Sequence, residues 1–362
     1  MAPQRNHLNW GHRIAVIPVR LKGRTLQPHK AVVAPLLGTR TVLTNSPWAF
    51  VSLWLKRHDR DDALFYWEQA RQFFDAADGM SPQSSPLLLY YSFMNATKAL
   101  LTAKGVAFNP YHGVAGVALT SPRGRIALSN EYVQIKQQGV LPSLSAYLGE
   151  TETQKRHSLQ ELFFNLVYIH RTYCLTYVSQ TDMFIPLVDT QYVIDTKSKE
   201  AYFRAKLSKD FAHARYHGVL PPSLAPEPSL NDVRAIRSTQ SVTLTGRSLG
   251  SQSNRDKLAS LNTSLRCDIQ YINGAQTLWY VKACVAGPRR LSRFPLTLTL
   301  AAMHRLSELC RYKPMELQSF LAGQKNWLVS EFLQLAPGQF IDELVAEITG
   351  YQFLAPNVRP AS

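Results

Sequence analysis

The sequence predicts an α+β protein in which an N-terminal helical bundle and C-terminal helices flank a central antiparallel sheet. Three observations favour this fold class. Residues 85–105 combine a Ser-Pro start, apolar helical spacing and a glycine stop. Residues 267–284 read as a hairpin with an Asn-Gly turn. From Phe294 the helical period returns, and 362 residues suffice for a large core or two domains.

The N-terminal segment mixes short apolar runs with Pro, Gly and Arg, so we expect extended segments and turns rather than helix. It holds seven Lys or Arg residues before Pro47 and no acidic residue. We divide the chain into a basic extended segment, a helical region, an antiparallel β region and a C-terminal helical region, with the boundaries 1–46, 47–180, 181–293 and 294–362.

The helical region begins at Asn45-Ser46-Pro47, a helix-start signal. A second helix is expected over 60–77, and the short link before residue 85 makes it pair antiparallel with the helix over 85–105. Apolar spacing predicts one long helix over 158–177. Between these helices we expect a loop over 109–125, a strand over 126–135 and a turn with a short helix over 139–149.

The β region is expected to form an antiparallel sheet of four or five strands. Runs rich in β-branched and aromatic residues, separated by polar turns, mark the strands, and a Pro-rich link at 220–230 interrupts them. The predicted strands cover 183–195, 200–208, 241–248 and the two arms of the 267–284 hairpin.

The net charge of +15 and a pI of about 9.7 favour an anionic partner, nucleic acid or nucleotide, although a basic surface can also bind nothing specific. Loop-tip Lys and Arg side chains suit phosphate contacts. We expect three basic clusters to converge on one concave surface; the alternative is that each is ordinary solvated surface. The clusters are Arg123/Arg125, Arg204/Lys206/Lys209 with His213, Arg215 and His217, and Arg289/Arg290/Arg293.

One narrow polar stripe on the 85–105 helix could face a ligand. Tyr91, Asn95, Lys98 and Thr102 share a side, and Lys104 and His112 follow the helix. The loop around His112, NPYHG, could present backbone N–H groups to an anion. The alternatives are a hydrogen-bonded helix–helix interface or a solvated face.

Residues 326–358 are acidic and lack Lys and Arg, which suggests a docking surface for a protein partner. This hypothesis makes the protein a scaffold without chemistry of its own. The acidic residues are Glu331, Asp342, Glu343 and Glu347.

The sequence points to no cofactor or metal. Walker A, Gly-x-Gly-x-x-Gly and Gly-x-Ser-x-Gly patterns are absent, the four cysteines form no Cys-x-x-Cys pair, and His213 and His217 lack an intervening glutamate. No apolar run is long enough to span a membrane and no secretory signal is evident, so we expect a reducing, cytoplasmic location without membrane contact.

The chain resembles the YaaC-like family of bacterial proteins. The resemblance rests on SPWAFVSLWL at 46–55, LLYYSFMNATKALLTAKG at 88–105 with YHG after it, and LSELCRYKP at 306–314. It extends over nearly the whole length. The family has no settled biochemical activity, so the resemblance implies an order of elements rather than a mechanism.

The helix pair over 60–105 is more loosely similar to HEPN domains, which implies RNA cleavage or nucleotide binding in toxin–antitoxin or phage-defence systems. The HEPN nuclease motif has Arg and His on a late helix with four to six residues between them. Here that spacing occurs at Arg5…His12 and Arg24…His29, both in loop-like sequence, so the resemblance implies a helical scaffold without nuclease activity.

Our leading hypothesis is therefore non-catalytic binding of nucleic acid or nucleotide, in a defence or regulatory setting. One alternative is a ribonuclease that uses His112 or His170 with a nearby arginine, because acid–base cleavage of RNA needs such a pair within hydrogen-bond reach. The other alternative is the protein-interaction scaffold.

Overall fold

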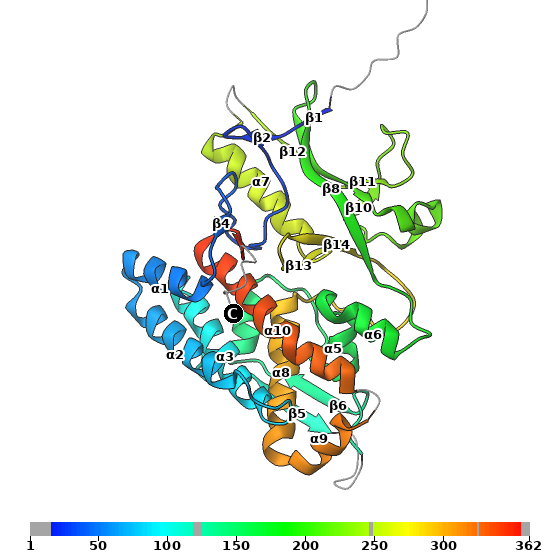
Figure 1. Ribbon diagram of the computed structural model, residues 1–362. Helices are drawn as coiled ribbons and strands as arrows, with labels where there is room; N and C mark the ends of the chain where they lie inside the picture. Colours follow the sequence, from blue (N-terminus) through cyan, green and yellow to red (C-terminus); the bar gives the residue numbers. More distant parts are fainter. Residues whose placement is uncertain (1–15, 119–124, 246–248, 324–325, 356–362) are drawn as a thin grey trace, which may run out of the picture.

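The computed structural model describes residues 16–118, 125–245, 249–323 and 326–355. The α+β class is confirmed. Helices form one part of the molecule, and a curled antiparallel sheet of eight strands forms the other (Figure 1). Each part has its own apolar cluster, and residues from both ends of the chain lie where the parts meet.

The prediction of an N-terminal helical bundle is wrong, because the helical part combines helices from both ends of the sequence. Its N-terminal members are α1 (Pro47–Arg57), α2 (Asp61–Ala77) and α3 (Ser85–Ala103). Its C-terminal members are α8 (Pro295–Tyr312), α9 (Pro314–Leu321) and α10 (Asn326–Thr349). Helix α3 packs against α2, α8 and α10.

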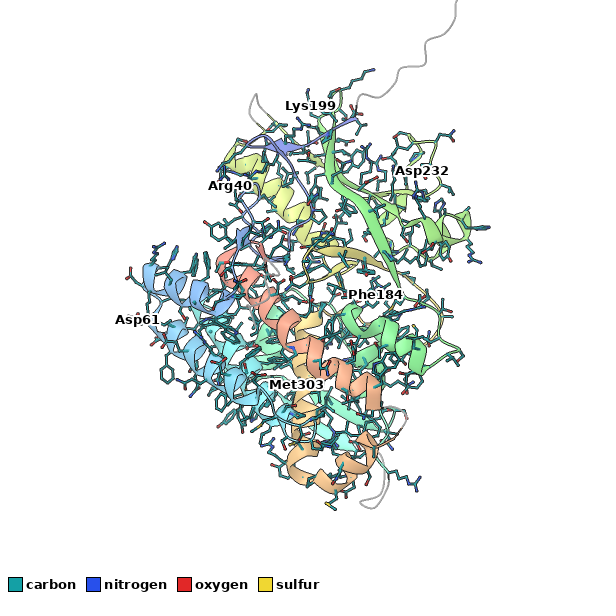
Figure 2. The ribbon with its side chains drawn as sticks, viewed as in Figure 1. Arg40, Asp61, Phe184, Lys199, Asp232 and Met303 are labelled. Carbon is teal, nitrogen blue, oxygen red and sulfur yellow. The ribbon has the colours of Figure 1, made fainter. Side chains whose placement is uncertain are left out.

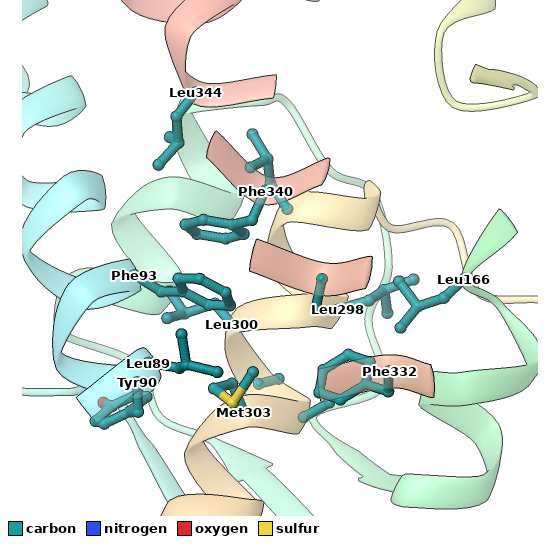
Figure 3. Packing of buried hydrophobic residues seen from close by; sticks show 14 of the residues in the cluster. Leu89, Tyr90, Phe93, Leu166, Leu298, Leu300, Met303, Phe332, Phe340 and Leu344 are labelled. Atoms are coloured by element: carbon teal, nitrogen blue, oxygen red, sulfur yellow. The ribbon is translucent and has the colours of Figure 1, made fainter. Parts of the chain in front are cut away.

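The apolar surface of α3 explains this arrangement. Its apolar side chains are buried on two sides of the helix, with Tyr90, Met94 and Leu101 on one side and Leu89, Phe93 and Leu100 on the other. Helices α1 and α2 alone therefore cannot cover it. Phe93 of α3 stacks on Phe340 of α10 with ring centroids 4.2 Å apart, beside Leu300 and Met303 of α8 (Figure 3). Burial of such rings contributes roughly 1.5–3 kcal/mol each.

The predicted long helix over 158–177 is broken in two. Helix α5 (Leu159–Phe164) begins at a capping box between Ser158 and Glu161, and α6 (His170–Thr176) follows a single 3₁₀ turn. Asn165 lies at the break. Its buried side-chain amide donates to the carbonyls of Glu161 and Arg289 and accepts the Leu291 N–H, and such bonds compete with helical ones.

A small antiparallel sheet occupies the region expected to be mostly loop. It has the order β5 (Val114–Ala118), β6 (Glu131–Ile135) and β7 (Arg156–Ser158). Only the second half of the predicted 126–135 strand pairs, and β5 lies inside the predicted loop. The short helix expected after it is α4 (Val140–Tyr147).

The eight-stranded sheet is larger than the four or five strands expected. Strand β8 (Phe184–Asp195) pairs with β14 at its start, with β9 along its length and with β1 at its end. A register shift between Val188 and Gln191 bends it, which accounts for the curl. The other strands are β1 (Val16–Pro18), β9 (Glu200–Leu207), β10 (Leu224–Pro226), β11 (Ala235–Ser238), β12 (Val242–Thr243), β13 (Ile269–Ile272) and β14 (Leu278–Lys282).

Helix α7 (Gln252–Leu265), which the sequence reading missed, belongs to the apolar cluster of the sheet. Its contribution is the sparse row Leu258, Leu261 and Leu265 on an otherwise polar helix. Two further strand pairs are short: β2 (Arg20–Leu21) with β3 (Arg24–Thr25), and β4 (Val42–Leu43) with β15 (Phe353–Leu354), the last in parallel.

A buried polar seam joins the two parts; we define it as Lys30, Arg266, Asp342, Glu343 and Glu347. All five side chains are buried. Lys30 pairs with Asp342, and Arg266 donates to the Lys30 carbonyl. Glu347 accepts the backbone N–H of Val32. The seam ties the N-terminal segment to α7 and to the last turns of α10.

Candidate functional site

The basic clusters predicted from the sequence lie on different elements. Arg123 lies outside the described residues, and Arg125 is exposed. On β9, Lys206 pairs with Asp189 at 3.2 Å and with Asp232 at 3.7 Å. Asp232 lies in the sheet part, on the opposite side from Arg40 (Figure 2). Arg204, also on β9, is half-buried.

The three arginines of the Arg289–Arg293 cluster pair with carboxylates of the protein itself. Arg289 pairs with Glu152 at 2.8 Å, Arg290 pairs with Asp268, and Arg293 pairs with Glu150 at 2.8 Å. The Arg293 side chain is 1 % exposed. The Arg289 and Arg293 pairs hold the segment before α8 against the α4–β7 connection, and the Arg290 pair holds it against the start of β13. The three charges are therefore compensated by protein carboxylates.

The histidines and acidic residues singled out above are also engaged. His213 Nδ1 accepts the Arg215 N–H, and His217 Nε2 lies 2.6 Å from the Val233 carbonyl oxygen. Asp342, Glu343 and Glu347 lie in the buried seam, and Glu331 alone of the four acidic residues is partly exposed.

Lys98 of the predicted stripe and His112 of the loop after it lie close enough for the Lys98 charge to act on the imidazole. Asn95 is buried, and Tyr91 stacks on Phe73 with centroids 5.4 Å apart. Lys98 is half-buried over the Tyr66 ring at 5.5 Å. Its positive charge acts on the partly exposed His112, which lies in the loop after α3.

His112 is the centre of a compact group of aromatic and charged side chains. Tyr90 Oη of α3 lies 2.5 Å from His112 Nδ1, and the His304 ring of α8 lies 5.0 Å from Tyr90 and 5.7 Å from His112. Arg311 of α8 also acts electrostatically on His112. We call Tyr90, Lys98, His112, His304 and Arg311 the His112 centre.

The loop that carries His112 is held by two glycines. Gly113 and Gly139 have φ values of +72° and +130°, and a Cβ on either would overlap the other. The carbonyls of Tyr111 and His112 accept the N–H groups of Val140 and Leu141 at the start of α4. The NPYHG loop therefore turns carbonyls toward a helix N-terminus, and its fixed path orients His112.

An ion-pair network supports the side of α8 that carries His304. Arg305 bridges Glu308 at 2.8 Å and the buried Glu131. The Gly116 N–H on β5 donates to Glu308 at 3.2 Å, and a Cβ at Gly116 would overlap both Glu308 and Arg305. A side chain at this position would displace the Glu308 and Arg305 head groups from their ion pair.

The electrostatics make both imidazoles neutral at pH 7. Burial lowers the pKa of His112, the charges of Arg311 and Lys98 lower it further, and Glu308 opposes this shift without reversing it. Burial lowers the pKa of His304 to about 4. Lys98 and Arg311 have no carboxylate ion-pair partner among the described residues, unlike Lys206, Arg289, Arg290 and Arg293.

His170, the other histidine considered for catalysis, has a hydrogen-bond partner at each ring nitrogen. It is 3 % exposed; its Nδ1 lies 3.0 Å from the Phe164 carbonyl oxygen, and its Nε2 accepts the Met183 N–H at 2.8 Å. Cys174 and Asp182 lie close enough to suggest a metal site. The donors do not fit one, because coordination at Nε2 would strip a buried N–H of its acceptor and burial raises the pKa of Cys174 to about 12.

The sequence reading found Lys98 and His112 but missed Tyr90, His304 and Arg311. Tyr90 belongs to an apolar row of α3, and His304 lies among buried apolar residues of α8. The available signal was the pairing of the motifs LLYYSF and LSELCRYKP, which carry Tyr90 and Arg311 and lie on the two packed helices.

A family model for YaaC-like proteins matches residues 40–348, which include the whole His112 centre. The chain belongs to the YaaC-like family. No curated protein and no solved structure matches it. The HEPN resemblance gains no support from these comparisons, and the intermixed N- and C-terminal helices of this YaaC-like fold contradict the HEPN-like bundle. Over the described ranges, no helix is long and apolar enough to cross a membrane.

Proposed function

We propose that the protein binds a phosphate-bearing ligand, a nucleotide or a nucleic acid, at the His112 centre. The observation that carries this proposal is that Lys98 and Arg311 both act on His112, while neither has a carboxylate partner in the described part of the chain. Glu308, the carboxylate that acts on His112, lies 3.9 Å from His304 and pairs with Arg305 rather than with Lys98 or Arg311. A phosphate group would supply the anion that these two cations lack, and guanidinium and ammonium groups are its usual partners.

The contrast with the other cations strengthens the proposal. Lys206, Arg289, Arg290 and Arg293 have carboxylates at ion-pair distance, so an incoming phosphate would have to displace a protein anion. In the part of the chain that the structure describes, no carboxylate lies at ion-pair distance from Lys98, so a phosphate would displace none there. The neutral imidazole adds a hydrogen-bonding group, because no bond to His112 Nε2 occurs among the described residues.

The test is binding of fluorescein-labelled single-stranded RNA, and separately of ATP, by fluorescence anisotropy and competition. The variant Lys98→Gln/Arg311→Gln should weaken binding at least tenfold, whereas Lys155→Gln/Lys209→Gln, which likewise removes two positive charges but at exposed positions, should not. For two phosphate contacts on a single strand, affinity should fall roughly sevenfold between 50 and 200 mM salt. An equal loss of affinity in both variants would mean that binding depends only on general electrostatic attraction.

A ribonuclease is the second candidate, favoured by the bond between Tyr90 and His112. Tyr90 O–H is positioned to donate to Met94 Sδ at 3.5 Å, which leaves the tyrosine oxygen to accept the Nδ1 proton of His112. In that tautomer Nε2 keeps its lone pair and can act as a base.

The step would be intramolecular transesterification. The 2′-hydroxyl proton passes to His112 Nε2, the 2′-oxygen bonds to phosphorus, and the P–O5′ bond breaks as the leaving oxygen takes a proton from the Lys98 ammonium group. Burial lowers the pKa of Lys98, which makes it a stronger acid than a solvated lysine. RNA cleavage that is unchanged in His112→Ala, with Lys155→Gln as control, would reject this assignment.

The scaffold alternative required the acidic C-terminal region as a docking surface. Asp342, Glu343 and Glu347 bond to groups of the protein itself, so this surface would have to be found elsewhere. Co-purification of a stoichiometric partner after nuclease treatment is the observation that would favour it.

A further inference from the structure

A cavity of about 280 Å³ shares no residue with the His112 centre. It lies where α1, the N-terminal segment and the end of α10 meet. Its walls are Leu36, Phe50, Leu53, Trp54, Arg57, His58, Thr349 and Tyr351.

The walls of this cavity are mostly aromatic and aliphatic. Trp54 stacks on His58 with centroids 4.0 Å apart, and Phe50 meets Tyr351 edge-on at 6.4 Å. Leu53 is 48 % exposed and Leu36 is 44 % exposed, although both are large apolar side chains. Uncovered apolar surface of this kind, around a concave site, is typical of ligand pockets.

The cavity wall has few polar groups, and those of Arg57 and His58 can contact a ligand. Arg57 is exposed, and no ion pair or hydrogen bond of its guanidinium group occurs within the described residues. His58 Nδ1 lies 2.7 Å from the Trp54 carbonyl oxygen, so its Nε2 remains for a ligand. Thr349 is already engaged, because its hydroxyl donates to the Val345 carbonyl. Arg57 is the one always-charged side chain in the wall.

The cavity is built by three segments that are fixed to one another. Ser46 caps α1 by accepting the Ala49 N–H, and the Leu36 N–H donates to the Gly350 carbonyl at 2.9 Å. Gly350 has φ of +75°, and a Cβ there would lie 2.7 Å from Leu36. The parallel pair β4–β15 holds the same segments together. A ligand would therefore meet a preformed site and lose little affinity to ordering of the protein.

We propose that this cavity binds a planar, mostly apolar organic anion of two fused rings, whose negative group pairs with Arg57. The size follows from volume, since a cavity of about 150 Å³ accommodates benzene, and 280 Å³ accommodates about two rings. The aromatic walls offer stacking and edge contacts to such rings. The guanidinium group matches a carboxylate or a phosphate, and the experiment distinguishes these two head groups.

The test is isothermal titration of the intact protein with 2-naphthoate, 2-naphthyl phosphate and uncharged 2-naphthol. We expect saturable 1:1 binding of an anion, tighter than 2-naphthol by tenfold or more, and a rise in the unfolding temperature on addition of ligand. The tighter of the two anions identifies the head group. Absence of binding by both anions, or equal affinity for 2-naphthol, would overturn the proposal.

Matched variants separate a specific pairing from general attraction. Arg57→Gln should weaken binding of the anion tenfold or more and leave the affinity for 2-naphthol unchanged. Lys56→Gln, which removes the neighbouring exposed charge from the same helix end, should leave both affinities unchanged. Leu53→Ala should weaken the binding of all three ligands. An equal loss of affinity for the anion in Arg57→Gln and Lys56→Gln would contradict the pairing of the anion with Arg57. Because Arg57 and Lys56 are exposed, circular dichroism should show both variants folded.

Discussion

Lys30 and Asp342 form a buried ion pair of 2.9 Å between residues that are 312 positions apart in the chain. Lys30 Nζ also donates to the Phe353 carbonyl and the Asn273 side chain, and Tyr271 donates to Asp342 at 2.8 Å. The pair therefore connects the N-terminal segment, the β13–β14 turn, α10 and the segment after α10. It stands at the junction of the two apolar clusters.

Removing one partner of this pair should destabilise the whole protein. Lys30→Met leaves the Asp342 carboxylate buried without a cation, so we expect a loss of about 3–5 kcal/mol in the free energy of unfolding at pH 7. Urea denaturation measures it. The control Arg71→Met breaks the exposed Arg71–Asp75 pair and should change stability by less than about 1 kcal/mol. Similar effects in the two variants would mean that the seam pair contributes no more than a surface pair.

The seam also predicts a pH dependence through Glu343. Burial raises its pKa from 4.5 to about 7, so below pH 4.5 the carboxyl is protonated in both folded and unfolded chains. Between pH 4.5 and 7 the unfolded chain ionises while the folded chain keeps its proton, so rising pH costs stability. Above pH 7 the cost is complete, at about 3 kcal/mol.

Glu343→Gln tests this dependence, because the amide cannot ionise and its oxygen can still accept from Gln339. The variant should be more stable than the wild type by about 3 kcal/mol at pH 8 and by less than about 1 kcal/mol at pH 5. Glu316→Gln, at an exposed position, should show no such trend. A stability difference that is the same at both pH values would contradict the raised pKa.

Gly116→Ala should disturb the support of the His112 centre. The added methyl group overlaps Glu308 and Arg305, so the Arg305 ion pairs must rearrange, at a cost of roughly 1–3 kcal/mol in stability. Ligand affinity at the His112 centre should fall as well. Gly218→Ala is the control, since no heavy atom lies within 4 Å of a Cβ there. Anisotropy and urea titrations of both variants measure the two effects.

Tyr90→Phe should release His112 without removing its ring. The loss of the Tyr90 hydroxyl, 2.5 Å from Nδ1, should shift the imidazole between its two tautomers, which ¹H–¹⁵N correlation spectra of the histidine ring report. The stability cost should be about 1 kcal/mol. His213, which is exposed and remote in the fold, provides the internal reference, and an unchanged His112 signal would show that the bond does not set the tautomer.

Local signals in the sequence predicted elements well when one helix or hairpin carried the whole pattern. The bounds of α2 and α3 agree with the apolar period, and the predicted β13–β14 hairpin forms. Its predicted turn is wrong, because Ile272 pairs with Leu278 and residues 273–277 form a longer loop than Asn-Gly alone. Helix α7 was missed because only three leucines mark its buried face. The break at Asn165 was missed because its partners, Arg289 and Leu291, lie far along the chain.

The errors at the larger scale have the same cause. The period of α3 indicated that it is buried but not which helices cover it, and its partners α8 and α10 come from the other end of the sequence. Likewise, a run such as Arg289–Arg293 gives no sign that Glu150, Glu152 and Asp268 neutralise it. Lys98 was singled out by its position on a helix face, but the absence of a carboxylate partner needed the structure.

The covering of α3 by α10 has a consequence during synthesis. Translation from Ala103 to Phe340, at roughly 5–20 residues per second, takes about 10–50 s. During that interval Phe340 is not yet available to stack on Phe93. The nascent chain therefore exposes the broad apolar surface of α3 to chaperones at the ribosome exit. Truncation anywhere before α10 should therefore yield aggregating polypeptide rather than a smaller folded unit.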